Sequence, residues 1–149
     1  MPVRVAETSK DLAPAASTMT MAALSAELPG RCGLRRYRRA HTGAMALVVV
    51  DAENTRRSQW PNVSREELLR RARAWAEHEG HELLVVFDGA APEDAPDVVG
   101  SRNADDAIVE LVPQLASPWW LVTSDRGLRE RVGDRPERVI GGGSFVRTI

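Results

Sequence analysis

The sequence after residue 44 predicts an α/β domain in which a mainly parallel sheet is covered by helices. The first observation is a set of strand-like segments with apolar runs: ALVVV at 46–50, ELLVVF at 82–87 and WWLVT at 119–123, followed by the shorter ERVI at 137–140. Strands that helices bury on both faces have such composition, whereas strands with one face in water alternate apolar and polar residues. The second observation is that segments with helical character separate these strands. This alternation is typical of parallel sheets with helical crossovers.

A long helix is predicted between Ser64 and Gly80. Ser64 and Glu67 match the capping-box pattern with which many helices begin, and Gly80 is a common residue just past a helix end. The apolar residues between them recur at helical spacing: Leu68, Ala72, Trp75 and Ala76.

The remaining elements follow from the same rules. A helix is expected over 104–115, distorted near Pro113 and ended by Ser117 and Pro118, and a short helix is expected over 124–132. Residues 89–103, rich in Gly, Pro and Asp, are predicted as a loop. After three glycines, residues 144–149 are predicted as one more short strand.

Composition excludes several classes of protein. At 149 residues, the chain is long enough for one domain with a hydrophobic core. Its single cysteine, Cys32, excludes an intrachain disulfide and a multi-cysteine zinc site. The sequence has no apolar run long enough to span a membrane and no secretory type of start, so we expect a cytoplasmic protein without a membrane partner.

The chain divides into two regions of opposite charge. Residues 1–44 hold seven basic and three acidic residues, a net +4, and are predicted as a mostly disordered extension with a short helix near MTMAALSAEL. Residues 45–149 hold thirteen basic and eighteen acidic residues, a net −5, and form the predicted domain. The basic cluster RCGLRRYRRAH keeps three interpretations: an arm on RNA phosphates, a solvated tail, or upstream sequence translated in error before a natural start at Met45.

Acidic residues follow three successive strands of the predicted sheet. Asp51 comes directly after the first strand, Asp88 after the second and Asp125 after the third. The carboxyl ends of parallel strands share one edge, where ligands of such sheets bind. The helix over 104–115 opens at the same edge with Asp105 and Asp106.

Each of these acids has an ordinary structural interpretation. Aspartate favours turns and helix N-termini, where it caps the backbone or complements the helix dipole. Together, however, they would crowd like charges into one cleft, which a protein tolerates when a cation offsets them. Oxygen donors without cysteine or histidine favour Mg²⁺ or Mn²⁺. The candidate metal ligands are Asp51, Asp88, Asp105, Asp106 and Asp125.

Helical spacing separates the two adjacent acids. Asp105 shares a face with the apolar residues Ile108, Val109 and Val112, so it is expected to lean over the sheet edge as a ligand. Asp106 shares a face with Glu110 and is expected to act as a capping charge or to support the metal site.

Four segments in order, VVVDAEN, VVFDG, SRNADDAIVE and LVTSDRGLRERV, resemble the PIN-like NYN superfamily, and especially its YacP-type ribonucleases. The resemblance covers residues 46–146 and implies a Rossmann-like three-layer α/β/α sandwich. It also implies a metal-dependent endoribonuclease, with the ribosome as a partner, since several relatives act on RNA there. The family's last strand is usually followed by a helix, which we expect here to be short or missing.

The resemblance maps the family's acidic positions onto Asp51, Asp105 and Asp125, and Asp88 is a further candidate. Asn54 and Ser124 match the polar positions beside them. Independently of the family, hydrolysis of single-stranded RNA needs an activated water and a sink for phosphate charge, which one or two metal ions supply. The candidate catalytic residues are Asp51, Asn54, Asp105 and Asp125.

Basic and aromatic residues near these acids are candidates for RNA binding. They are Arg102 and Arg126, together with Arg56 and Arg57, and Ser124 beside them. Each arginine also has an ordinary interpretation as a surface charge. Trp60 is a candidate for base stacking, although a cover over the sheet edge is the favoured interpretation.

Sequence motifs exclude two alternative enzyme classes and leave two other functions open. A haloacid-dehalogenase phosphatase needs Asp-x-Asp where this chain has Asp51 and Glu53, and a lysine in the catalytic domain, whereas the only lysine is Lys10. A P-loop nucleotidase is excluded because its glycine-rich motif is absent. A non-catalytic PIN-like module that binds RNA or protein stays open, as does a toxin nuclease opposed by an antitoxin.

Overall fold

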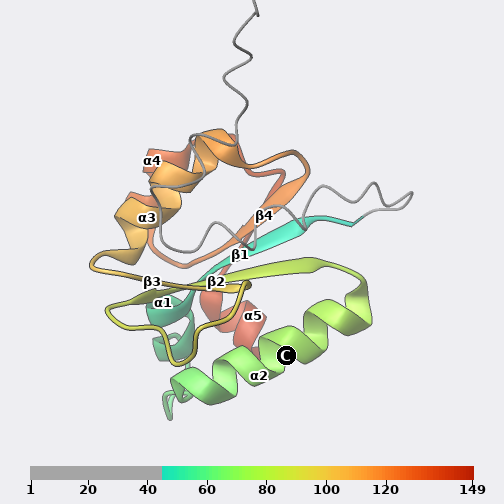
Figure 1. Cartoon of the computed structure of the whole chain (residues 1–149), viewed down its shortest axis with the longest axis vertical. Coiled ribbons are helices and arrows are strands. Elements are labelled where there is room, and N and C mark those ends of the chain that lie inside the picture. The colour runs from blue at the N-terminus through green and yellow to red at the C-terminus, as the bar shows by residue number, and fades with distance from the viewer. Residues whose placement is uncertain (1–44) are drawn as a thin grey trace, which may run out of the picture.

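The computed structural model describes residues 45–149 (Figure 1). The predictions for 1–44, namely the disordered extension, its short helix and the basic cluster, lie outside the described residues.

The described residues form a five-stranded sheet. Its strands are β1 (Leu47–Asp51), β2 (Glu82–Asp88), β3 (Val98–Ser101), β4 (Trp119–Val122) and β5 (Arg138–Ile140). Their order is β3-β2-β1-β4-β5, and every neighbouring pair is parallel. The chain first builds outward from β1 through β2 to β3, and then crosses to β4 on the other side. The order therefore reverses between β1 and β4, which is where parallel sheets open a crevice for ligands.

Helices cover both faces of the sheet (Figure 1). One face carries α1 (Ala52–Arg57), α2 (Arg65–Glu79) and α5 (Gly142–Thr148). The other carries α3 (Ala104–Leu111), the short 3-10 helix η3 (Val112–Gln114) and α4 (Arg126–Val132). The three-layer α/β/α arrangement and the parallel sheet predicted from the sequence are confirmed.

Alternate residues of the strands point to opposite faces of the sheet and pack in two separate hydrophobic cores. In β1, Val48 and Val50 pack with Leu68 of α2, whereas Val49 packs with Ile108 of α3 and Leu128 of α4. All six of these side chains are fully buried, and each contributes about 1.5–3 kcal/mol by leaving water. This two-sided burial explains why the strands lack polar alternation.

The predicted boundaries of α2 are confirmed by its caps. The Ser64 hydroxyl accepts a hydrogen bond from the Glu67 backbone N–H at 3.1 Å. Gly80 follows the helix with a φ of 72°, a left-handed conformation that costs glycine little.

Three elements differ from the sequence prediction. Strand β3 lies within the segment 89–103 that was predicted as a loop, and α1 begins directly at the end of β1. The predicted terminal strand is wrong, because α5 occupies these residues. Phe145 of α5 is buried edge-on against Trp75 with ring centroids 5.0 Å apart, so packing overrides the β-propensity of the segment. The closing helix expected to be short or missing is a seven-residue helix.

The predicted helix over 104–115 is split, because Pro113 follows α3 and the chain continues as η3. Among the helices described between residues 45 and 149, none is long and apolar enough to cross a membrane.

Candidate active site at the carboxyl edge of the sheet

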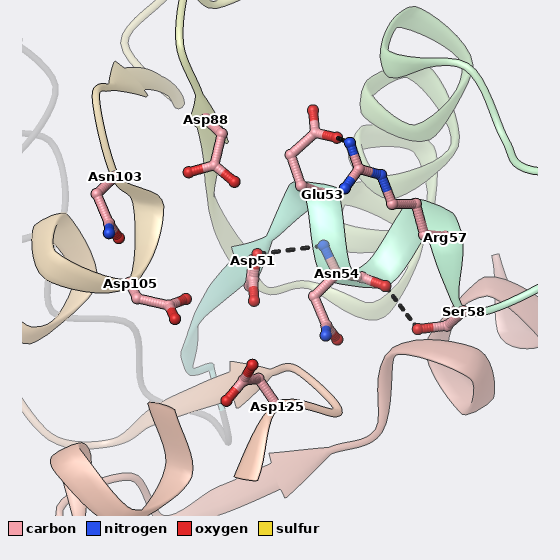
Figure 2. A pocket seen from close by; sticks show the side chains of 9 residues that line it. All are labelled: Asp51, Glu53, Asn54, Arg57, Ser58, Asp88, Asn103, Asp105 and Asp125. Atoms are coloured by element: carbon pink, nitrogen blue, oxygen red, sulfur yellow. Dashed lines mark hydrogen bonds and ion pairs between the residues drawn. The ribbon is translucent and has the colours of Figure 1, made fainter. Parts of the chain in front are cut away.

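Four aspartates from different segments line one cavity at the carboxyl edge of the sheet. Asp51 ends β1, Asp88 ends β2, Asp105 lies in the first turn of α3 and Asp125 precedes α4. The cavity has a volume of about 420 Å³. Figure 2 shows the four carboxylates around a common space. The remaining lining residues are Glu53, Asn54, Arg57, Ser58 and Asn103.

Asp51 is the most buried of the four, with 3% of its surface exposed. Its carboxylate accepts hydrogen bonds from the Thr123 hydroxyl at 3.0 Å and from the Asn54 backbone N–H at 3.4 Å. Burial nevertheless raises the pKa of Asp51 from 3.8 to about 6, with smaller contributions from the negative charges of Asp105 and Asp88. The site therefore holds a buried acid that lacks sufficient positive charge around it.

Thr123 connects the ends of β1 and β4. Its hydroxyl donates to Asp51 and accepts from the Asp125 backbone N–H at 3.1 Å. Thr123 is fully buried, so this one hydroxyl fixes the relative position of two acidic segments. Sequence reasoning missed this role, although the position of Thr123 at the end of an apolar strand was a usable signal.

Asp88 and Asp125 also cap helices. Asp125 accepts from the Leu128 backbone N–H at 2.9 Å at the start of α4, and Asp88 accepts from the Ala104 backbone N–H at 2.7 Å at the start of α3. Capping and a place in the cavity are therefore compatible. Each cap uses one oxygen and fixes the direction of the carboxylate, which leaves the other oxygen for the cavity.

The structure separates Asp105 from Asp106. Asp105 lines the cavity, and its pKa is raised by burial and by the nearby charges of Asp125 and Asp88. Asp106 is outside the cavity lining and pairs with Arg131 of α4 at 2.7 Å. The orientation predicted from helical spacing is therefore confirmed, while the structure does not bring Asp106 to the other acids.

Hydrogen bonds of Asn54 and Ser124 connect the segments that form one side of the cavity. The Asn54 side-chain oxygen accepts from the Ser124 backbone N–H at 2.7 Å. The Ser124 hydroxyl accepts from the Gly142 backbone N–H at 2.9 Å, at the start of α5. Asn54 lines the cavity, whereas Ser124, predicted to bind RNA, does not.

Glu53 is buried, but three arginines surround it. Its oxygens lie 2.8 Å from Arg56, 3.1 Å from Arg57 and 2.6 Å from Arg65. Figure 2 shows Glu53 turned toward Arg57 and away from Asp51. Glu53 is therefore a neutralised acid, and its role as an anchor for arginines was missed in the sequence.

Three of the four arginines predicted to bind RNA lie outside the cavity lining. Arg102 and Arg126 are exposed, and Arg56 is tied to Glu53 and to the Val63 carbonyl. Arg57 alone of the candidates lines the cavity. The favoured interpretation of Trp60 as a cover over the sheet edge is wrong, because 86% of its surface is exposed.

Comparison with known proteins identifies the fold. No family model matches the chain, and no curated protein matches it. Among solved structures, it is similar to a mutant of Rae1 (YacP) from Bacillus subtilis, with a TM-score of 0.58 and 20% sequence identity. The match covers 70% of this chain and 74% of the other. The chain has a YacP-like fold.

The donor chemistry of the cavity suits a hard divalent cation, because the side chains at its centre offer only oxygens. The spacing is less compact than a closed metal site. Within residues 45–149, no three acidic, histidine or cysteine side chains are grouped closely enough to hold one ion together. A cation here would therefore take one or two carboxylates directly and reach the others through water, as Mg²⁺ commonly does.

Proposed function

We propose that this protein is a Mg²⁺- or Mn²⁺-dependent endoribonuclease that cleaves single-stranded RNA by phosphodiester hydrolysis. The observation that carries the proposal is the cavity in which Asp51, Asp88, Asp105 and Asp125 meet at the carboxyl edge of a YacP-like fold. The sequence resemblance to YacP-type ribonucleases supports the same conclusion from the motifs.

A cation gives these carboxylates a physical reason to be together. Two like charges about 4 Å apart repel by about 1 kcal/mol in water and by about 4 kcal/mol at a protein surface. Burial and, to a smaller extent, the charges of neighbouring aspartates raise the pKa of Asp51 and of Asp105, so a nearby cation would stabilise the ionised form of both carboxylates. Glu53, which has its own arginines, is the exception and is not expected to bind the ion.

Each residue then has a definite task. A bound divalent ion would supply an activated water and offset charge on the phosphate oxygens. Asp51 and Asp125 would hold the ion, because strand ends and a helix cap fix their carboxylates. Asp105 and Asp88 would accept hydrogen bonds from its water shell. Thr123 and Asn54 keep the two halves of the site in register.

The proposal is tested by cleavage of a fluorescently labelled single-stranded RNA with Mg²⁺, with Mn²⁺ and with EDTA. We expect cleavage with either metal, none with EDTA, and a loss of at least about 100-fold for Asp51→Asn and Asp125→Asn, since loss of a ligand exceeds the cost of losing its supports. Asp134→Asn is the matched control, because Asp134 is exposed and outside the cavity lining. Activity that survives both EDTA and Asp51→Asn would reject the proposal.

Metal binding has a readout that does not depend on cleavage. A ligand that binds only the folded state stabilises it by about 2.7 kcal/mol at 100 times its dissociation constant. MgCl₂ is therefore expected to raise the melting temperature of the wild type and of Asp134→Asn, but much less that of Asp51→Asn. An equal rise in all three proteins would argue against a metal at the cavity.

The alternative is a non-catalytic PIN-like module that binds RNA or protein. The absence, within residues 45–149, of three grouped acids is the observation that favours it. RNA binding without cleavage under any metal would identify this alternative. Action at the ribosome stays a prediction from the sequence resemblance.

A further inference from the structure

The cluster around Glu53 holds more positive than negative charge. One carboxylate faces three guanidinium groups, those of Arg56, Arg57 and Arg65. Arginine is always charged in proteins, so the cluster keeps an excess of two positive charges beside a cavity that is otherwise acidic. Such an excess attracts an anion that must approach the carboxylates.

Two of the three arginines use their donors within the protein. Arg56 has 20% of its side chain exposed and donates to Glu53 and to the Val63 carbonyl. Arg65 donates to the carbonyls of Asp88 and Ala90. Arg56 therefore connects α1 to the segment before α2, and Arg65 connects α2 to the segment at the end of β2.

Arg57 differs from the other two. It has 62% of its side chain exposed, makes the longest of the three contacts with Glu53 at 3.1 Å, and lines the acidic cavity. In the described part of the chain, this contact is the only ion pair or hydrogen bond of its side chain. A guanidinium has five N–H donors, so Arg57 keeps donors for a ligand while Glu53 holds it in place.

Trp60 lies close to the same rim. Ser58 lines the cavity, and Trp60 is two residues further along, which limits the separation of their Cα atoms to about 7 Å. Trp60 is the one large apolar side chain described as exposed among residues 45–149. Lone exposed apolar residues are ordinary, but an exposed indole within three residues of a guanidinium that keeps spare donors matches the two needs of single-stranded RNA, a cation for the phosphate and a ring for the base.

We propose that Arg57 and Trp60 form a subsite for single-stranded RNA at the α1 end of the cavity, where Arg57 binds a backbone phosphate and a base stacks on Trp60. Glu53 is the positioning residue for Arg57. This inference rests on the proposed function and specifies the end of the cavity at which the RNA substrate binds. It also selects Arg57 over Arg56, Arg102 and Arg126.

The two contacts differ in their dependence on salt, which allows separate tests. A phosphate contact releases counterions, so the logarithm of the binding constant falls with the logarithm of salt concentration by about 0.7 per contact for single strands. Stacking on an aromatic ring releases no counterions and contributes about the same affinity at any salt concentration.

The experiment measures fluorescence anisotropy of a labelled single-stranded RNA with the Asp125→Asn protein, a variant that is expected to leave the RNA uncleaved. Binding is titrated at several KCl concentrations. Arg57→Ala is expected to lower the magnitude of the salt slope by about 0.7, and Arg57→Lys to keep the slope because it keeps the charge. Trp60→Ala is expected to weaken binding about 5- to 150-fold with an unchanged slope, and Trp60→Phe to restore most of the affinity.

Arg70→Ala is the matched control. Arg70 has 67% of its side chain exposed and pairs with Glu67 on α2, but it does not line the acidic cavity. Its removal changes the net charge equally and is expected to leave affinity and slope unchanged. Circular dichroism melting of each variant confirms that it is folded.

The subsite is rejected if Arg57→Ala and Arg70→Ala change the slope equally, or if Trp60→Ala binds RNA like its parent. Cleavage by the wild type together with either result would reject the subsite alone. Binding that depends on Arg57 and Trp60, without cleavage by the wild type, would keep the subsite and reject the nuclease. No RNA binding by any protein would reject both.

Discussion

At Asp51, stabilising hydrogen bonds are opposed by the cost of burying a carboxylate. Its carboxylate caps α1 and accepts from Thr123, which stabilises the local fold. Its burial among other acids opposes this stabilisation, because the charged form is poorly solvated. Replacement of this residue therefore separates stability from activity.

The effect of pH follows from the raised pKa. The folded protein binds the Asp51 proton more tightly than the unfolded chain does, because its pKa is about 6 instead of 3.8. The free energy of unfolding therefore falls as the pH rises from about 4 to about 6. Above that range, the ionised Asp51 lowers it by about 3 kcal/mol relative to the protonated form.

Without metal, we expect Asp51→Asn to be more stable than the wild type at pH 8 by about 1–2 kcal/mol. The gain is smaller than the full cost because an amide cannot accept both hydrogen bonds. The difference should shrink as the pH falls from about 6 to about 4. Urea denaturation in EDTA at pH 8 and pH 4.5 measures both values, and a difference independent of pH would contradict the assignment.

Asp105 and Asp106 provide a second test at the residue scale. They are neighbours on α3, but only Asp105 lines the cavity, while Asp106 pairs with Arg131. Asp105→Asn is expected to lower the cleavage rate by about 10- to 100-fold, and Asp106→Asn by less than about threefold. Equal losses would show that the electrostatic field of the helix start matters more than contact with the cavity.

At the scale of elements, the packing of α5 against α1 supports one side of the cavity. The helix begins where Gly142 meets α1, and a Cβ at Gly142 would lie 2.7 Å from the Ser58 hydroxyl oxygen and 2.9 Å from the Thr55 Cα. The same residue donates to Ser124, which in turn is held by Asn54. The geometry of the cavity wall therefore depends on close contact between two helices.

We expect Gly142→Ala to destabilise the protein by about 1–3 kcal/mol, because backbone atoms of α1 cannot move aside. Gly143→Ala is the control in the same helix, since its Cβ would approach no atom closer than 3.3 Å. Urea unfolding compares the two variants. A smaller loss for Gly142→Ala than for Gly143→Ala would contradict the contact.

At the scale of the whole molecule, residues 45–149 contain two hydrophobic cores, one on each face of the sheet. Removal of residues 1–44 is therefore expected to leave the domain folded, with an unfolding midpoint within about 0.5 kcal/mol of the full chain. Urea denaturation of both forms makes the comparison. Loss of cooperative unfolding after the deletion would place the domain boundary earlier in the chain.

The fold could be predicted largely because its signals are local. Unbroken apolar strands, the capping box at Ser64 and the stop at Gly80 each depend on residues close in sequence. Strand β3 escaped prediction because it is a four-residue edge strand that contains Gly100. Helix α5 escaped prediction because its packing involves a contact between Phe145 and Trp75, which are far apart in the sequence.

Sequence patterns alone predict the parallel sheet and bring Asp51, Asp88 and Asp125 to its carboxyl edge, because strand direction determines where each strand ends. The same patterns place Asp105 there, at the start of the helix that opens at this edge. The pairing of charges, and which of them face the cavity, became visible only in the folded chain. The fold turned Glu53 toward three arginines, paired Asp106 with Arg131 and left Arg57 at the rim. These pairings depend on neighbours in space, and the neighbours come from segments whose separation the sequence pattern does not encode.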